Sequence, residues 1–125
     1  MPTAATDPER IVREFCATWP ERNVEKLLAY FTDDAVYHNM PLEPVTGKNS
    51  IREVLNMFVP GEDLEAEILN LATCGNLVFT ERVDRMTLNG KRVVLPCAGV
   101  FEIRGWKIVA WRDYFDMATF QRQAG

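Results

Sequence analysis

Two aspartates and an arginine occupy positions where the surrounding sequence predicts buried β-strands. Arg82 and Asp84 are two residues apart and therefore share one face of a strand, and Asp113 lies on a strand face among large apolar neighbours. A buried carboxylate is costly unless it is paired, and the five N–H donors of arginine can bridge two carboxylates. The sequence therefore predicts a cluster in which Arg82 holds Asp84 and Asp113.

Two further polar side chains lie in another strand-like segment, residues 35–40. Alternation places Tyr37 and Asn39 on one face and His38, the only histidine of the chain, on the opposite face. We interpret His38 as a packed or surface residue. Five polar groups that converge on one pocket favour a catalytic site, whereas a buried ion-pair network that only fixes strand register is the alternative interpretation.

Three helices are predicted before the main strands. Asp7 is expected to cap the first, Asn23 the second, and the third begins near Asn49 and ends at a Pro-Gly pair, residues 60–61. The residues predicted to face inward are Ile11, Val12, Phe15 and Trp19, then Leu27, Leu28 and Phe31, then Ile51, Val54, Leu55 and Phe58.

From residue 64 onward the apolar pattern changes to a period of two, which is typical of strands. The predicted strands span residues 64–71, 77–88, 92–103 and 106–115 and indicate an antiparallel meander, with the Asn-Gly pair at 89–90 as the strongest hairpin signal. Asp116 is expected to cap a last helix that buries Met117 and Phe120. The faces that matter are Val78, Thr80, Arg82, Asp84 and Met86 on the second strand and Val109, Trp111, Asp113 and Phe115 on the last.

This order of elements indicates an α+β architecture. We expect the N-terminal helices to pack in the concave face of a strongly curved, mixed or antiparallel sheet, which encloses a pocket. The order is similar to the cystatin-like, nuclear-transport-factor-like cone, a fold that hosts many activities. A length of 125 residues, with no repeat or linker, predicts one domain covering residues 1–125.

Composition excludes several classes of function. A net charge of -4 disfavours nucleic acid and anionic membranes as partners, and no apolar run approaches the roughly 20 residues of a membrane span. Three cysteines, Cys16, Cys74 and Cys97, lack metal-site spacing, so we expect no metal and no disulfide but reduced thiols in the cytoplasm. Residues 1–6 carry no export signal, and no motif implies a cofactor.

The polar residues resemble a known family. Segments 37–42, 80–84, 99–101 and 111–116 are similar to the limonene-1,2-epoxide hydrolases, and the likeness extends from the first helix to Phe120. The resemblance implies that Asp84 is a general acid and Asp113 a general base, with Arg82 bridging them. It also implies that Tyr37 and Asn39 position the reacting water.

The same resemblance implies a homodimer with an apolar pocket that binds a small hydrophobic epoxide, cyclic or terpene-like. The pocket-lining positions would be Met86, Leu95, Cys97 and Phe115. Trp19 and Phe58 are core residues by periodicity, although their expected closeness to the polar cluster would also let them line a cavity.

Opening an epoxide with water requires a proton for the departing oxygen and a base for the water. The roles that the resemblance implies therefore require Asp84 to stay protonated near neutrality while Asp113 is ionised, and the expected product is a vicinal diol formed without a covalent intermediate. One alternative is an isomerase or cyclase with Asp113 as base and Tyr37 as oxyanion donor, but such an enzyme has no need of the second carboxylate held by Arg82. Another is a non-catalytic binding or dimerisation module.

Overall fold

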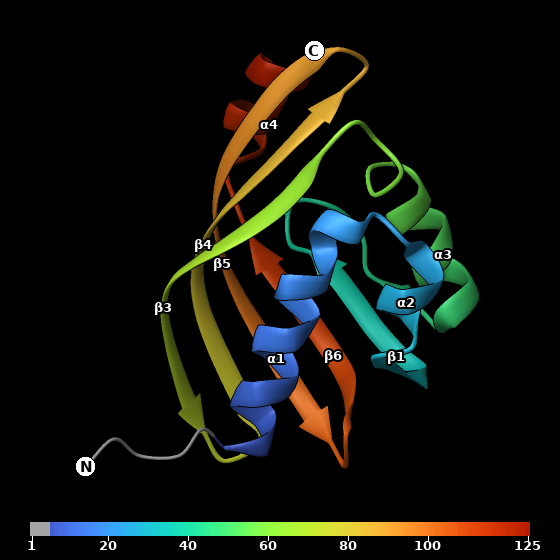
Figure 1. Cartoon of the computed structure of the whole chain (residues 1–125), viewed down its shortest axis with the longest axis vertical. Coiled ribbons are helices and arrows are strands. Elements are labelled where there is room, and N and C mark those ends of the chain that lie inside the picture. Colours follow the sequence, from blue (N-terminus) through green and yellow to red (C-terminus); the bar gives the residue numbers. More distant parts are fainter. Residues whose placement is uncertain (1–5) are drawn as a thin grey trace.

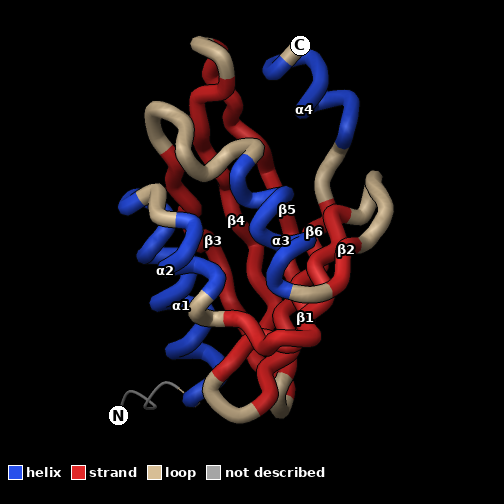
Figure 2. Tube along the Cα trace, turned by 90° about the vertical axis from the view of Figure 1, so that its right-hand side faces the viewer, coloured by secondary structure: helices blue, strands red, loops and turns tan. Residues whose placement is uncertain are grey.

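A curved six-stranded sheet forms the frame of the molecule (Figures 1 and 2). The computed structural model describes residues 6–125. Residues 1–5, most of the segment expected to carry no export signal, lie outside the described residues. The spatial order β2-β1-β6-β5-β4-β3 is made by β1 (Phe31–Asn39), β2 (Val45–Thr46), β3 (Leu64–Cys74), β4 (Leu77–Leu88), β5 (Lys91–Arg104) and β6 (Lys107–Tyr114).

The sheet is mixed. Strands β3 to β6 form the predicted antiparallel meander, and the β4–β5 turn is made by Asn89 and Gly90, both at positive φ (52° and 78°) as a tight hairpin requires. Strand β1, by contrast, lies parallel to β6, which pairs Tyr37 with Trp111 and Asn39 with Asp113. This parallel pairing brings the two N-terminal polar residues to the end of the meander.

The N-terminal helices cover one face of the sheet, as the sequence predicts. They are α1 (Asp7–Thr18), the 3-10 turn η1 (Trp19–Glu21), α2 (Val24–Leu28) and α3 (Lys48–Asn56). The last helix, α4 (Met117–Ala124), instead lies along β5, where Gln123 hydrogen-bonds with the backbone of Val94. Figure 1 shows α1 lying across the sheet, with α2 and α3 beside it. Among residues 6–125, no helix is both long and apolar enough to cross a membrane.

The predicted caps are confirmed for α2 and α4 and are wrong by one residue for α1. Asn23 accepts a hydrogen bond from Lys26 N (3.2 Å), and Asp116 accepts one from Thr119 N (3.0 Å). For α1, Thr6 is the cap and accepts from Glu9 N (3.2 Å). Asp7 is instead the first helical residue, where its negative charge still lies near the positive end of the helix.

The core lies between α1 and the concave face of the sheet. Phe15 of α1 is fully buried and packs edge-on against Phe31, Phe101 and Trp111, with ring centroids 5.2–6.0 Å apart. All four residues predicted to face inward from the first helix are buried, as are Leu27, Leu28, Ile51 and Leu55. Val54 and Phe58 are only half-buried, because they line a pocket rather than the core.

Two predictions about the C-terminal third are wrong. Val109 does not share the buried face of Trp111 and Asp113: the β5–β6 register shifts next to it, and Ile108 is fully buried instead. Such a bulge inserts one extra residue and inverts the alternation before it. The last helix also buries no residue completely, because Met117 and Phe120 lie half-buried along the same pocket.

Candidate active site

Three inward-facing residues of β4 begin the site. Thr80, Arg82 and Asp84 lie at alternate positions of the strand and are 4%, 1% and 5% exposed, so each points into the concave side. Asp113 reaches the same place from β6 and is 4% exposed. We call these four residues the carboxylate cluster. Its members come from two strands that are separated by β5.

Arg82 contacts every other member of the carboxylate cluster. Its Nε and Nη2 donate to the two oxygens of Asp84 (3.0 and 2.9 Å), and its Nη1 and Nη2 donate to the two oxygens of Asp113 (3.2 and 2.9 Å). Nη1 also donates to Thr80 Oγ1 (3.0 Å). Five donor hydrogens therefore find five oxygen acceptors, and the faces of Trp19 and Phe101 lie 5.6 and 5.9 Å from the guanidinium carbon.

The strand between the two carboxylates provides the space for this contact. Gly99 of β5 lies opposite both Thr80 and Asp113 in the strand register. A Cβ atom at Gly99 would collide with Arg82 Nη1, would lie 2.6 Å from Asp113 Oδ1 and would lie 3.0 Å from Thr80 Oγ1. The hydrogen bonds of the carboxylate cluster can therefore form only if residue 99 is a glycine.

Strand β1 supplies two polar groups beside Asp113. Its parallel pairing with β6 sets Tyr37 against Trp111, where the two rings stack with centroids 4.2 Å apart, and it sets Asn39 against Asp113. Tyr37 is 3% exposed, and both Tyr37 and Asn39 line the pocket described below. The five polar residues predicted from the sequence are thus brought together. His38 points elsewhere and contacts the Leu42 carbonyl through Nε2 (2.9 Å).

Burial and neighbouring charges set the protonation states. Burial raises the pKa of Asp84, and the negative charge of Asp113 adds to the rise against the opposing effect of Arg82. Burial by itself would lower the pKa of Arg82, but the charges of Asp113 and Asp84 raise that pKa well above its ordinary value, so the guanidinium stays charged. Burial raises the pKa of Tyr37 well above its ordinary value, which keeps the phenol neutral.

An apolar cavity of about 240 Å³ opens above the carboxylate cluster. Asp84, Asp113, Tyr37 and Asn39 are polar residues of its wall, and the four residues predicted to line a pocket all do so. The wall is made by Trp19, Tyr37, Asn39, Leu42, Val54, Met57, Phe58, Asp84, Met86, Leu88, Leu95, Cys97, Asp113, Phe115, Met117 and Phe120.

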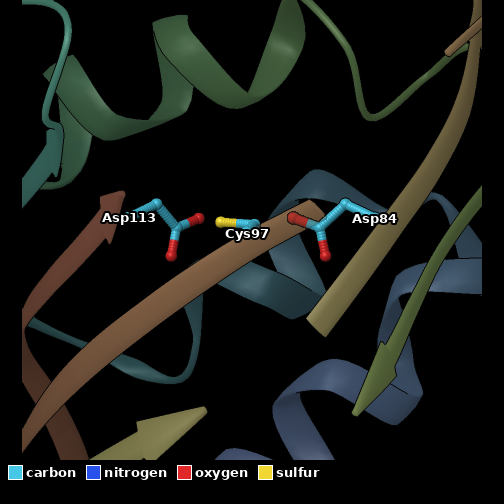
Figure 3. Close-up of side chains that lie close together, drawn as sticks. All are labelled: Asp84, Cys97 and Asp113. Atoms are coloured by element: carbon cyan, nitrogen blue, oxygen red, sulfur yellow. The ribbon is translucent and has the colours of Figure 1, made fainter. Parts of the chain in front are cut away.

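Cys97 lies between the two carboxylates, as Figure 3 shows. One potential metal-binding atom of each of Asp84, Cys97 and Asp113 lies within 4.8 Å of the others. Arg82 Nη2, however, contacts all three groups, at 2.9 Å from each carboxylate and 3.3 Å from the sulfur. The guanidinium therefore supplies the positive charge that this group of acceptors requires. Burial and the charge of Asp113 also raise the pKa of the Cys97 thiol, so it is protonated.

Three residues of the site were named from the sequence only by their strand position and were given no role. Thr80 accepts from Arg82, Gly99 leaves the space for the contact, and Trp111 donates from Nε1 to Asp113 Oδ1 (2.7 Å). An isolated glycine within a strand pattern is a known sign of close approach, so Gly99 carried a usable signal. Trp111 carried a weaker one, because a buried indole N–H needs an acceptor and Asp113 lies two residues further on the same face.

The chain is similar to known proteins in sequence and in fold. Residues 6–124 match the model of the limonene-1,2-epoxide hydrolase catalytic domain. The chain is 30% identical over 106 residues to epoxide hydrolase EphG of Mycobacterium tuberculosis, covering 85% of this chain and 71% of that protein.

Solved structures also share the fold of this chain. An LEH-like epoxide hydrolase from M. tuberculosis superposes with a TM-score of 0.82 at 27% identity, over 94% of this chain and 89% of that one. A SnoaL-like polyketide cyclase from Shewanella putrefaciens superposes with a TM-score of 0.83 at 14% identity, over 96% and 97%, which bears on the fold alone. By the match of almost its whole length to the family model and by its likeness to EphG, the chain belongs to the limonene-1,2-epoxide hydrolase family.

Proposed function

We propose that residues 1–125 act as one epoxide hydrolase domain, which adds water to a small apolar epoxide in one step and releases a vicinal diol. The observation that carries this proposal is the contact of one guanidinium with two buried carboxyl groups at the wall of an apolar cavity. In this proposal the two carboxyl groups serve one bound molecule, one as proton donor and the other as proton acceptor.

Asp84 is the general acid in this proposal. Its pKa is raised by burial, so it retains a proton that it can donate to the epoxide oxygen as the carbon–oxygen bond breaks. With Asp84 neutral, Asp113 ionised and Arg82 positive, the carboxylate cluster carries no net charge, which suits its burial. Proton transfer from a positioned acid typically contributes a factor of ~10² to ~10⁴ in rate.

Asp113 is the general base, and it removes a proton from the attacking water. Tyr37 and Asn39 lie on the neighbouring strand, where they can hold that water against Asp113 and in line with an epoxide carbon. Holding the water in place removes part of the entropic cost of bringing the reactants together. Arg82 does not transfer a proton; it fixes both carboxyl groups through its hydrogen bonds.

The cavity indicates the class of substrate. Apart from the polar groups around Asp84 and Asp113, its wall is made of aliphatic, aromatic and methionine side chains, among them Met86, Leu95 and Phe115. A ligand that buries most of its surface there must be compact and apolar, with its one polar atom at the carboxylate cluster. Cyclic and terpene-like epoxides have this chemistry.

We also propose that the protein is a cytoplasmic homodimer. Its three cysteines are unpaired, which suits a reducing compartment. The outer face of the sheet carries exposed apolar side chains, including Phe79 (42% exposed), Val94 (38%) and Tyr114 (46%), with Pro96 and Ala98 between them on β5. Exposed apolar side chains gathered on one face, here beside the charged Glu81 and Arg85, favour a subunit interface.

A single turnover in heavy-oxygen water tests the mechanism. With a terpene epoxide, enzyme in excess and labelled solvent, direct attack puts the label into the diol in the first turnover. Label found first in an aspartate of the protein would indicate a covalent ester and exclude direct attack. If cyclic epoxides give no diol whereas a ketosteroid is isomerised, the isomerase alternative replaces this proposal.

A further inference from the structure

Trp111 joins two of the three polar groups that we assign to the reacting water, Asp113 and Tyr37. It is 1% exposed, its Nε1 donates to Asp113 Oδ1 over 2.7 Å, and its ring stacks on Tyr37 with centroids 4.2 Å apart and planes at 9°. One side chain thus contacts both the base and the phenol beside it.

Strand register explains why these contacts are simultaneous. Tyr37, Trp111 and Phe101 are direct partners on the adjacent strands β1, β6 and β5, so their side chains lie side by side on the concave face. Phe101 stacks on the indole at 5.5 Å and 15°, and Phe15 packs against it edge-on at 5.2 Å. The ring is therefore held from three directions, and its N–H has a fixed orientation.

The hydrogen bonds of Asp113 leave one position free for a water. A carboxylate offers about four lone-pair positions. On Oδ1, Trp111 Nε1 and Arg82 Nη1 (3.2 Å) take both, whereas on Oδ2 Arg82 Nη2 (2.9 Å) takes one. The remaining position lies on Oδ2. The thiol of Cys97 also faces this carboxyl, but an S–H group is a weak donor.

We propose that Trp111 is a positioning residue of the epoxide hydrolase reaction. Its N–H occupies Asp113 Oδ1 and holds the carboxylate so that Oδ2 receives the proton of the attacking water, while its ring fixes the plane of Tyr37. This role rests on the proposed function, since it assigns the oxygen that acts within that reaction.

The sharpest test replaces only the N–H group. Incorporating β-(3-benzothienyl)alanine at position 111 exchanges N–H for sulfur and keeps the size and stacking of the ring. Because a hydrogen bond to a charged group is worth about 1.5–3 kcal/mol, we expect kcat to fall about 10- to 100-fold. KM should stay within about twofold, because the lost contact does not touch the substrate.

Matched variants separate positioning from packing. Trp111→Phe loses the N–H and part of the stack, so its kcat should fall at least as far as that of the isostere, whereas Trp106→Phe, at a 61% exposed position, should match the wild type. Wild-type kcat in the isostere, a change confined to KM, or loss of the fold at the assay temperature by circular dichroism would each overturn the proposal.

A measurement without substrate keeps this test separate from the proposed function. The chain has three tryptophans, so a nitrogen-15 NMR spectrum shows three indole N–H signals. We expect that of Trp111 to move in Asp113→Asn, because its acceptor becomes neutral, while that of exposed Trp106 stays in place. A Trp111 signal that does not respond to Asp113→Asn excludes the positioning role, whatever the protein does to epoxides.

Discussion

Gly99 lies directly opposite Asp113 in the β5–β6 register, and Asp113 meets Arg82 in the space that a side chain at position 99 would fill. The glycine has no role in proton transfer itself. It is nevertheless required for the carboxylate cluster, because any Cβ atom would overlap the guanidinium and crowd Asp113 Oδ1 at 2.6 Å.

Gly99→Ala should therefore abolish turnover and lower the free energy of unfolding by about 1–3 kcal/mol, as overpacking of a filled interior does. The measurements are diol formation and urea denaturation. Gly75→Ala is the control: it strains a turn residue at φ 60° but has open space around it, so it should lose some stability and keep full kcat. Normal activity in Gly99→Ala would show that the cluster can form without this space.

Asp113→Asn should fold and bind substrate but lose the base. We expect kcat to fall by a factor of ~10² to ~10⁴, the usual contribution of general base catalysis. Asp34→Asn is the matched control, because Asp34 pairs with Arg104 at an exposed site on β1. Diol formation at the wild-type rate, or a protein that unfolds, would contradict the assignment of Asp113.

The raised pKa of Asp84 predicts how the rate depends on pH. Asp84 must be protonated to donate, so kcat should fall as pH rises through its raised pKa. The titratable groups that face it are Arg82, Asp113 and Cys97. A rate that stays constant far into the alkaline range would count against Asp84 as the acid.

The free energy of unfolding should also depend on the proton of Asp84. Between the ordinary pKa of Asp84 and its raised value, the folded protein holds a proton that the unfolded chain releases, so the free energy of unfolding decreases as pH rises through this window. Asp84→Asn, a neutral isostere, should flatten this dependence in urea titrations at a series of pH values. An unchanged slope in the variant would show that Asp84 is not the group responsible.

Arg82→Lys should lose activity and stability although the positive charge is kept. A lysine has three donors on one nitrogen and cannot form paired hydrogen bonds with two carboxylates. We expect loss of turnover and a decrease of about 3 kcal/mol in the free energy of unfolding. Arg85→Lys, on the opposite face of β4 with Glu65 and Glu67 as partners, should change both quantities little. Equal effects at the two positions would mean that the paired hydrogen bonds of the Arg82 guanidinium are unimportant.

Ala98→Arg tests the proposed dimer. The substitution puts a charge into the exposed apolar face between Pro96 and Tyr114, so sedimentation velocity should show a dimer for the wild type and a monomer for the variant. Glu14→Arg, on the exposed side of α1, should leave the dimer intact. A monomeric wild type would contradict the proposed dimer. A dimeric Ala98→Arg variant would show that the interface lies elsewhere.

Alternation along a strand is enough to predict that Arg82 and Asp84 share a buried face, because side-chain direction there depends only on the two-residue period. It is not enough for Val109, since a bulge changes the count by one residue. The sequence pattern also could not predict that β1 pairs with β6, because the paired residues are more than half the chain apart.

The roles of Gly99 and Trp111 follow from register between strands rather than from either strand alone. Gly99 matters because Thr80 and Asp113 flank it, and Trp111 matters because Tyr37 and Phe101 lie on either side of its ring. A pattern read along one segment contains no information on these lateral neighbours. The polar residues were predictable because their burial is unusual by itself.

We expect the parallel pairing of β1 with β6 to form later in folding than the hairpins of the meander. The hairpins of the meander close short loops, whereas Tyr37 and Asn39 must find Trp111 and Asp113 across most of the polypeptide, at a greater loss of chain entropy. A refolding chain should thus form its long hairpins first and pair β1 with β6 last, so that enzymatic activity recovers later than strand content.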